Sequence, residues 1–177
     1  MSILQTVTPE SATGEVAEIY AQIKSAWGHV PTAIQAYSAN PFLLKQQWEY
    51  YGNIMQHPTL TFPLTASIRM LISEASQCNY CIDMNAGMLI NMAGWTPEQV
   101  AATRANYNDS PLSPKEKTLL GLVLKATRDS NSVTAADMQA ARAAGWSDSD
   151  ILDAVNHGAR ALAGDIIING FKVERDF

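Results

Sequence analysis

The stretch Glu74–Met88, EASQCNYCIDMNAGM, contains both cysteines of the chain as a CxxC motif, Cys78 and Cys81. The residues before Cys78 continue a helical pattern of apolar positions that starts near Leu64. The residues after Cys78 begin a second such pattern. The pair is therefore expected at a helix N-terminus. There, free backbone N–H groups and the positive end of the helix dipole favour a thiolate. The helix start also lets the two sulfurs approach more closely than positions i and i+3 within a regular helix.

Helical periodicity extends along the whole chain, without a convincing alternating strand pattern. Leu64, Ile68, Leu71 and Ile72 recur at helical spacing on one face. Residues 57–63, HPTLTFP, read as a loop that ends at Pro63. Helix starts are indicated by a cap residue or an early proline at Pro31, Pro41, Thr96, Ser113, Thr134 and Ser147. The pattern predicts an all-α fold.

A weak internal repeat suggests how these helices are organised. MAGWTPEQV (Met92–Val100) resembles AAGWSDSDI (Ala143–Ile151), and each copy follows two helical segments. This predicts one domain over residues 1–177, built from two related helical units of which only the first carries thiols. Chance similarity around one AGW triplet is the competing interpretation.

The last helix has two apolar faces. One stripe contains Val155, Ala159, Leu162 and Ile166. The opposite face contains His157, Ala161, Gly164 and Ile168, which is small and apolar. A helix of this kind packs on two sides, and one side is a candidate subunit interface.

Composition narrows the function classes. Apolar residues make up 47% and charged residues 16% of the 177 residues, which is typical of a globular protein. The net charge of −5 argues against nucleic acid or an anionic membrane surface as a partner. No signal peptide or membrane-spanning apolar run is visible. We therefore expect a cytoplasmic protein. In a reducing compartment, a close cysteine pair is more often catalytic or metal-binding than a structural disulfide.

Three interpretations of the cysteine pair follow from the residues alone. The pair can be a redox centre, in which a thiolate is oxidised and its neighbour closes a disulfide. It can be two small residues that pack a helix junction. It can also be half of a metal site shared between subunits, because two cysteines and three scattered histidines do not complete a four-ligand zinc site in one chain.

The segment LISEASQCNYCIDMNAGML resembles the signature of the carboxymuconolactone decarboxylase/AhpD-like superfamily, in particular its peroxidase-related CxxC branch. The upstream GHVPTAIQAYSANPFLL and the downstream half from LSPKEKTLLGLVLKA to ILDAV are similar to the same family, so the resemblance covers most of the chain. It implies an all-helical, duplicated AhpD-like fold and a homo-oligomer (dimer, trimer or hexamer), with the site near a subunit interface.

The resemblance also implies a chemistry: reduction of a small peroxide through a CxxC disulfide, without a bound cofactor or metal. Carried over residue by residue, Cys81 would attack the peroxide and Cys78 would resolve the product. A lipoyl-bearing partner or another dithiol would supply the reducing equivalents.

Two positions depart from the family pattern. The histidine four residues after the second cysteine is Asn85 in this chain, and the glutamate twelve residues before the first cysteine is Ala66. In the family these two residues form a proton relay. An amide can orient a thiol by hydrogen bonding, but it does not transfer protons near neutral pH. Loss of a general acid–base group typically slows a reaction by about 10²–10⁴-fold.

Three further residues are candidates for the missing relay, each with a structural alternative. Glu74 lies one helical turn before Cys78, but it can equally be a solvated charge at a helix end. Tyr80 can donate a hydrogen bond to the site, or pack as an aromatic at the helix junction. His157 lies on the second face of the last helix, where an interface histidine with its own hydrogen bonds is the alternative.

The sequence therefore favours an enzyme, a thiol-dependent peroxidase or disulfide reductase in antioxidant defence. The alternative is a redox-sensing or structural oligomer whose degenerate relay does not support turnover. The lactone decarboxylase activity that names the superfamily is the least favoured interpretation, since nothing in the sequence points to a lactone site.

Overall fold

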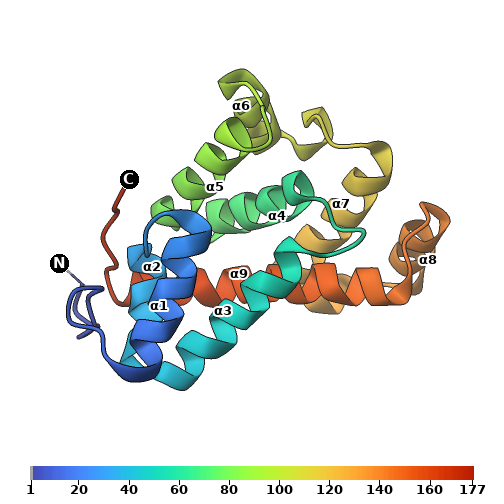
Figure 1. Cartoon of the computed structure of the whole chain (residues 1–177). Coiled ribbons are helices and arrows are strands. Elements are labelled where there is room, and N and C mark those ends of the chain that lie inside the picture. Colours follow the sequence, from blue (N-terminus) through green and yellow to red (C-terminus); the bar gives the residue numbers. More distant parts are fainter. Residues whose placement is uncertain (1) are drawn as a thin grey trace. The chain divides into compact units, whose positions relative to one another are not determined.

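The computed structural model describes residues 2–177, and within this range it contains helices and no strand (Figure 1). This confirms the all-α prediction. The α-helices are α1 (Gly14–Trp27), α2 (Thr32–Gln35), α3 (Pro41–Met55), α4 (Phe62–Ala75), α5 (Asn79–Asn91), α6 (Pro97–Ala105), α7 (Pro114–Arg128), α8 (Ala135–Ala143) and α9 (Asp148–Gly170). Short 3-10 helices are η1 (Ala36–Ala39), η2 (Tyr107–Asp109) and η3 (Ser130–Ser132).

The predicted helix starts are confirmed by their caps. Thr96 and Ser113 each form a capping box, in which the N-cap hydroxyl and the side chain of the third helical residue satisfy each other's backbone N–H groups. One boundary was wrong: α4 begins at Phe62 and not after Pro63. The Thr61 side chain accepts a hydrogen bond from the Leu64 N–H, and Pro63 in the first turn needs no donor there.

The two AGW triplets of the weak repeat share a left-handed glycine but differ in the hydrogen bonds of the turn. Gly94 and Gly145 are both left-handed, with φ of +72° and +91°. The following tryptophan N–H donates back to the preceding helix in each case, from Trp95 to the Leu89 carbonyl at 3.1 Å and from Trp146 to the Ala141 carbonyl at 3.2 Å. The shared feature is the glycine conformation, because the tryptophan hydrogen bond spans six residues in the first copy and five in the second. Construction from two related units within a single domain remains a prediction.

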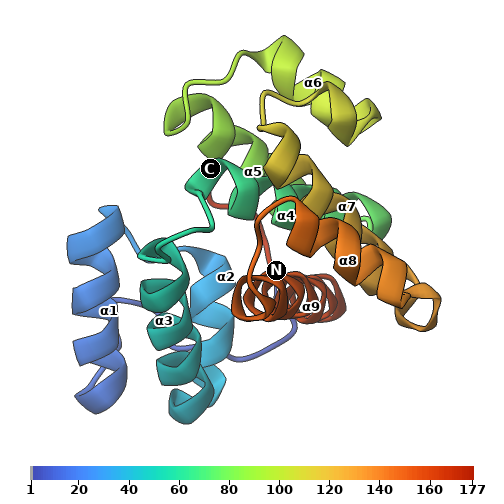
Figure 2. The same ribbon diagram turned by 90° about the vertical axis from the view of Figure 1, so that its right-hand side faces the viewer.

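The chain groups into two compact units. The first comprises residues up to 57 together with 167–177, and the second comprises residues 58–166. In the first unit, α1 packs against α3 (Figure 2) around a core of Val16, Ile19, Tyr20, Ile23, Val30, Ile34 and Leu44. Trp27 meets Trp48 edge to face, with ring centroids 5.2 Å apart. The two ends of the chain also meet here, where the Ile3 N–H donates to the Phe171 carbonyl at 3.0 Å.

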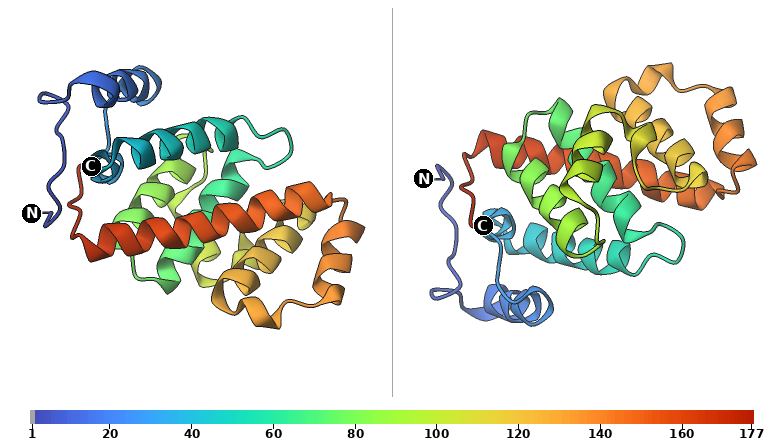
Figure 3. Two further views of the ribbon diagram at one scale, coloured as in Figure 1. Left: turned by 90° about the horizontal axis from the view of Figure 1, so that it is seen from below. Right: turned by 90° about the horizontal axis from the view of Figure 1, so that it is seen from above.

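The second unit places α4 against α5 and α7, and its last helix is α9, the long helix in orange and red in Figure 3. The buried face of α9 contains His157, Gly158 and Asp165. The stripe of Val155, Ala159, Leu162 and Ile166 stays at least partly exposed in the chain. None of the helices within residues 2–177 is long and apolar enough to cross a membrane.

At Gly158, α9 packs tightly against α4 and α7. A Cβ atom built there would lie 2.7 Å from Val123 Cγ1 on α7 and 3.0 Å from Ile72 Cδ1 on α4. Such distances are below van der Waals contact, so only a residue without a side chain lets the three helices pack this closely.

We predict that Gly158→Ala lowers the free energy of unfolding by about 1–3 kcal/mol, because the added methyl group overpacks the junction. Gly87→Ala on α5 is the matched control, since the nearest atom to its new Cβ is 4.0 Å away. That control is expected to keep or raise stability, by up to about 1 kcal/mol from helix propensity. Urea denaturation of both variants measures the difference, and equal stability of the two would refute close packing at Gly158.

Candidate functional site

The two cysteines lie where the sequence predicted, at the start of α5. Cys78 is the N-cap residue and Cys81 lies in the first turn. Both are free thiols, with 0% of Cys78 and 8% of Cys81 exposed. Cys78 therefore faces the protein interior, and Cys81 is the one that a small molecule can reach.

A carboxylate on α9 joins the two thiols. The two sulfurs and a carboxylate oxygen of Asp165 all lie within 4.8 Å of one another. Asp165 is 1% exposed. Its Oδ1 accepts a hydrogen bond from Ser73 Oγ at 2.9 Å, and its Oδ2 accepts one from Ser76 Oγ. The end of α4, the start of α5 and one face of α9 thus meet at a single buried cluster, which we call the thiol–carboxylate cluster (Cys78, Cys81 and Asp165).

The pKa values of the two thiols are displaced in opposite directions. The Cys81 thiol lowers the pKa of Cys78 by donating a hydrogen bond to it, against the opposing effects of burial and of the Asp165 charge. The same hydrogen bond raises the pKa of Cys81, and burial and Asp165 raise it further. The Cys78 sulfur makes no capping hydrogen bond, so its thiolate character comes mainly from Cys81. The hydrogen bond therefore favours a thiolate on Cys78 over a thiolate on Cys81.

The residue types of this cluster are also those that bind zinc. A structural zinc site takes four protein ligands and a catalytic one takes three with an open position, and the cluster offers three. Both carboxylate oxygens of Asp165 already accept hydroxyl hydrogen bonds, and the thiols are hydrogen-bonded to each other. The interpretation of the cysteine pair as part of a metal site shared between subunits therefore stays a prediction, beside that of a redox pair.

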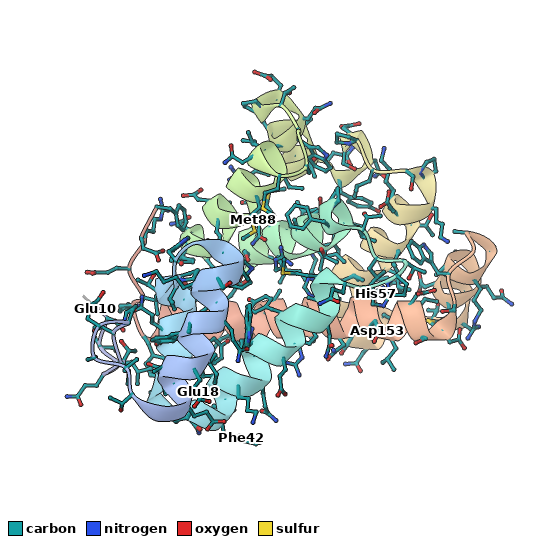
Figure 4. The ribbon with its side chains drawn as sticks, viewed as in Figure 1. Glu10, Glu18, Phe42, His57, Met88 and Asp153 are labelled. Atoms are coloured by element: carbon teal, nitrogen blue, oxygen red, sulfur yellow. The ribbon has the colours of Figure 1, made fainter. Side chains whose placement is uncertain are left out.

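Asn85 belongs to a second hydrogen-bond network, which does not include the sulfurs of Cys78 and Cys81. Its side chain is fully buried, and its Nδ2 donates to the Cys81 carbonyl at 2.7 Å. Its Oδ1 accepts from Arg69 Nε at 2.7 Å. Arg69 also lies 3.2 Å from His157 Nε2 and 3.9 Å from the sulfur of Met88, which Figure 4 labels on α5. Asn85 thus bridges α5 to α4 and makes no relay to the thiols.

The other candidate relay residues are placed as follows. The Glu74 carboxylate forms an ion pair with Arg104 on α6, so it is held at the surface. Tyr80 is buried in the first turn of α5. Ala66 is fully buried on α4. His157 is buried inside this chain, where its Nε2 lies 3.2 Å from the Thr65 carbonyl.

Sequence reasoning missed Asp165. Helical spacing places it on the same face as His157 and Ala161, and we expected that face to be small and apolar. The available signal was a single acidic residue in the apolar run ALAGDIIING near the end of the chain. A charged residue in such a run is either exposed to solvent or buried with polar partners. The helical periodicity alone does not distinguish the two cases.

The buried His157 makes the stability of the fold depend on pH. Burial first, and the nearby Arg69 charge second, lower the pKa of His157 from 6.5 to about 3. The unfolded chain therefore binds a proton at this residue below about pH 6.5, whereas the folded chain does so only near pH 3. The neutral histidine stabilises the fold fully above the unfolded pKa, and this contribution is lost as the pH falls toward the folded pKa.

We predict that the free energy of unfolding falls more steeply in the wild type than in His157→Gln between about pH 7.5 and about pH 5. The difference in slope approaches about 1.4 kcal/mol per pH unit below the unfolded pKa, which corresponds to one proton. Urea denaturation across this range measures both slopes. Parallel slopes would show that His157 is protonated in the folded protein.

Comparison with known proteins supports the fold. The sequence matches no protein-family model and no curated protein. An uncharacterized peroxidase-related protein from Silicibacter sp. TM1040 superimposes with a TM-score of 0.86 at 21% identity, covering 99% of this chain and 92% of that one. The alkylhydroperoxidase AhpD core, an uncharacterized peroxidase-related protein from Ralstonia eutropha JMP134, gives a TM-score of 0.86 at 20% identity over the same shares of 99% and 92%.

A third solved structure shows that this architecture occurs with another activity. A cysteine-to-alanine variant of the debrominase Bmp8, in complex with 2,3,4-tribromopyrrole, gives a TM-score of 0.80 at 13% identity and covers 99% of this chain and 94% of that one. At such identities the likeness concerns the fold. The resemblance inferred around the cysteine motif is thereby confirmed at that level: the chain has the AhpD-like fold.

Proposed function

We propose that the protein is a thiol-dependent peroxidase or disulfide reductase that uses Cys78 and Cys81 as its redox pair, in antioxidant defence. The observation that carries the proposal is the pair of free thiols, hydrogen-bonded to each other at the N-terminus of α5 inside an AhpD-like fold. Two adjacent thiols at a helix start can close a disulfide with little backbone movement.

The exposure of the two thiols supports a division of roles. Cys81, the more accessible thiol, attacks a small peroxide and becomes a sulfenic acid. Cys78 then attacks the Cys81 sulfur and closes the disulfide. A dithiol, either lipoyl or another, reduces the disulfide and restores the pair. A bound metal or cofactor has no part in this cycle.

The competing function is a redox sensor or structural oligomer that forms the disulfide once and does not turn over. This alternative is supported by the residues at the family's two relay positions, because neither Asn85 nor Ala66 can transfer protons. Lactone decarboxylation remains the least favoured interpretation, since no feature of the cluster suits a lactone.

We further propose that the protein self-associates through α9. Leu152 and Ile166 are 68% and 65% exposed, and they lie on one face with Val155, Ala159 and Leu162. Exposed apolar stripes of this kind are typical of subunit interfaces. Light scattering after size-exclusion chromatography would give the mass, and a Leu152→Glu variant with unchanged mass would count against this surface.

We predict that purified protein consumes cumene hydroperoxide catalytically with dithiothreitol or dihydrolipoamide as reductant. Cys81→Ser is expected to lose this turnover, because the remaining thiol, Cys78, is fully buried. In a single turnover without added reductant, Cys78→Ser is expected to consume one equivalent of peroxide and to keep a sulfenic acid on Cys81 that dimedone traps. Mass spectrometry of the trapped adduct identifies the attacking sulfur.

Two outcomes of this experiment decide against the proposal. Stoichiometric disulfide formation without turnover would indicate the redox-sensing alternative. Peroxide consumption that is unchanged in Cys81→Ser would rule out the thiol mechanism.

We also predict that Glu74→Gln leaves peroxide turnover within about twofold of the wild type. The Glu74 carboxylate is engaged by Arg104, so its charge is not required at the sulfurs. A surface ion pair of this kind contributes at most about 1 kcal/mol to stability, and the variant should fold normally. A loss of turnover of about 10²-fold would instead make Glu74 the relay carboxylate.

A further inference from the structure

Asp165 is a buried acid for which the redox cycle described above has no role. Its carboxylate lies within 4.8 Å of both sulfurs, and it comes from α9, a helix remote in sequence from the CxxC motif. Ser73 and Ser76 fix the two oxygens in place from the end of α4. A carboxylate held this firmly beside two reacting atoms has the geometry of a proton acceptor.

Its electrostatic effect does not explain its presence. The Asp165 charge raises the pKa of both thiols, so it opposes thiolate formation at equilibrium. The charges that act on the thiols are Asp165 and the thiols themselves. Among the charged groups of the surrounding helices, Arg69 contacts Asn85 and His157, and Glu74 pairs with Arg104.

A purely structural role for Asp165 is also an incomplete explanation. The two serine hydroxyls could be tied to α9 equally well by an asparagine carbonyl, which would avoid burying a charge. Taking a carboxylate out of water costs several kcal/mol, even after partial compensation by hydrogen bonds. A strongly buried ionisable group beside nucleophilic side chains is typical of a functional site.

We propose that Asp165 is the proton-transfer residue of the Cys78–Cys81 pair, which takes the place of the relay lost at Asn85 and Ala66. The inference rests on the proposed thiol redox function. It assigns to α9 the acid–base chemistry that the resembled family keeps on the two helices around its cysteines.

The proton balance of the cycle shows where Asp165 acts. The cycle begins once the pair has lost one of its two protons, so that the two sulfurs share the remaining one. As this proton moves onto Cys78, the Cys81 thiolate attacks the outer oxygen of the peroxide. The O–O bond breaks, Cys81 becomes S–OH, and the alkoxide leaves and takes a proton from solvent.

The second step requires the carboxylate. Cys78 is now a thiol, and it must lose its proton before it can attack the Cys81 sulfur. Asp165 takes this proton, the S–S bond forms and the S–O bond breaks. The departing hydroxide takes the proton from Asp165 and leaves as water. The thiols are oxidised, the peroxide is reduced, and Asp165 returns to its carboxylate form.

The decisive variant is Asp165→Asn, which keeps the size of the side chain and removes the acid–base group. We expect two changes of opposite sign. Thiolate absorbance in a pH titration should appear at lower pH, because the Asp165 charge that raises the pKa of both thiols is gone. Disulfide formation from the Cys81 sulfenic acid should slow by about 10²-fold or more, because no group in the buried cluster accepts and returns the proton.

The opposite signs separate proton transfer from a structural effect, which would impair both readouts together. Stopped-flow mixing with one equivalent of peroxide, followed by dimedone trapping, measures the resolution step. Asp153→Asn is the matched control on the same helix, labelled in Figure 4, and it should leave both readouts unchanged. Resolution in Asp165→Asn at the wild-type rate would overturn the inference.

The test does not depend on peroxide activity. A small aromatic disulfide forms a mixed disulfide with Cys81, and its release by Cys78 requires the same proton transfer. If the wild type fails to reduce peroxide, the proposed peroxidase function fails. Slow release in Asp165→Asn would still support the role of Asp165, and release at the wild-type rate would refute it.

Ser76→Ala covers the case in which Asp165→Asn does not fold. This variant keeps the carboxylate and removes one of the two hydroxyls that position it. Resolution is expected to slow by about tenfold, the kinetic equivalent of one hydrogen bond. Circular dichroism confirms the fold, and an unchanged resolution rate in a folded Ser76→Ala would also count against the inference.

Discussion

The close approach of α9 to α4 at Gly158 is the constraint on which the cluster depends. Gly158 lets the two helices pack at a distance that no other residue permits. Asp165 lies two turns further along the same face of α9, opposite Ser73 and Ser76 near the end of α4. The glycine therefore sets the distance at which the carboxylate reaches the thiols, although it touches none of them.

Burial of Asp165 is the main energetic cost of this arrangement. The serine hydroxyls offset part of it, and the remaining lone pairs face two thiols that are themselves almost fully buried. In such surroundings protons move between fixed partners more readily than to water. The same low polarity that makes the charge costly makes a positioned proton acceptor effective.

Local features of the fold could be predicted from sequence, whereas contacts between distant helices could not. The cap at Ser113 and the helix start at the CxxC motif follow from neighbouring residues, and both are confirmed. Asp165 lies on the face of α9 that the periodicity suggested to be small and apolar, so the pattern gave no reason to expect a buried carboxylate there. Which helix that face would meet depends on the packing at Gly158, and no local pattern encodes it. For the same reason the partner of Asn85, the Arg69 guanidinium, was not anticipated.

The residues at the family's two relay positions explain why the acid–base group lies on another helix. Ala66 is fully buried, so a glutamate there would place a second charge inside the core. Asn85 is held between the Cys81 carbonyl and the permanent positive charge of Arg69. Burial and the Arg69 charge, which lower the pKa of His157, would also favour the neutral form of an imidazole in that position. Arg69 therefore makes position 85 a poor site for a titrating group at neutral pH, whereas the Asp165 carboxylate on α9 lies within 4.8 Å of both sulfurs.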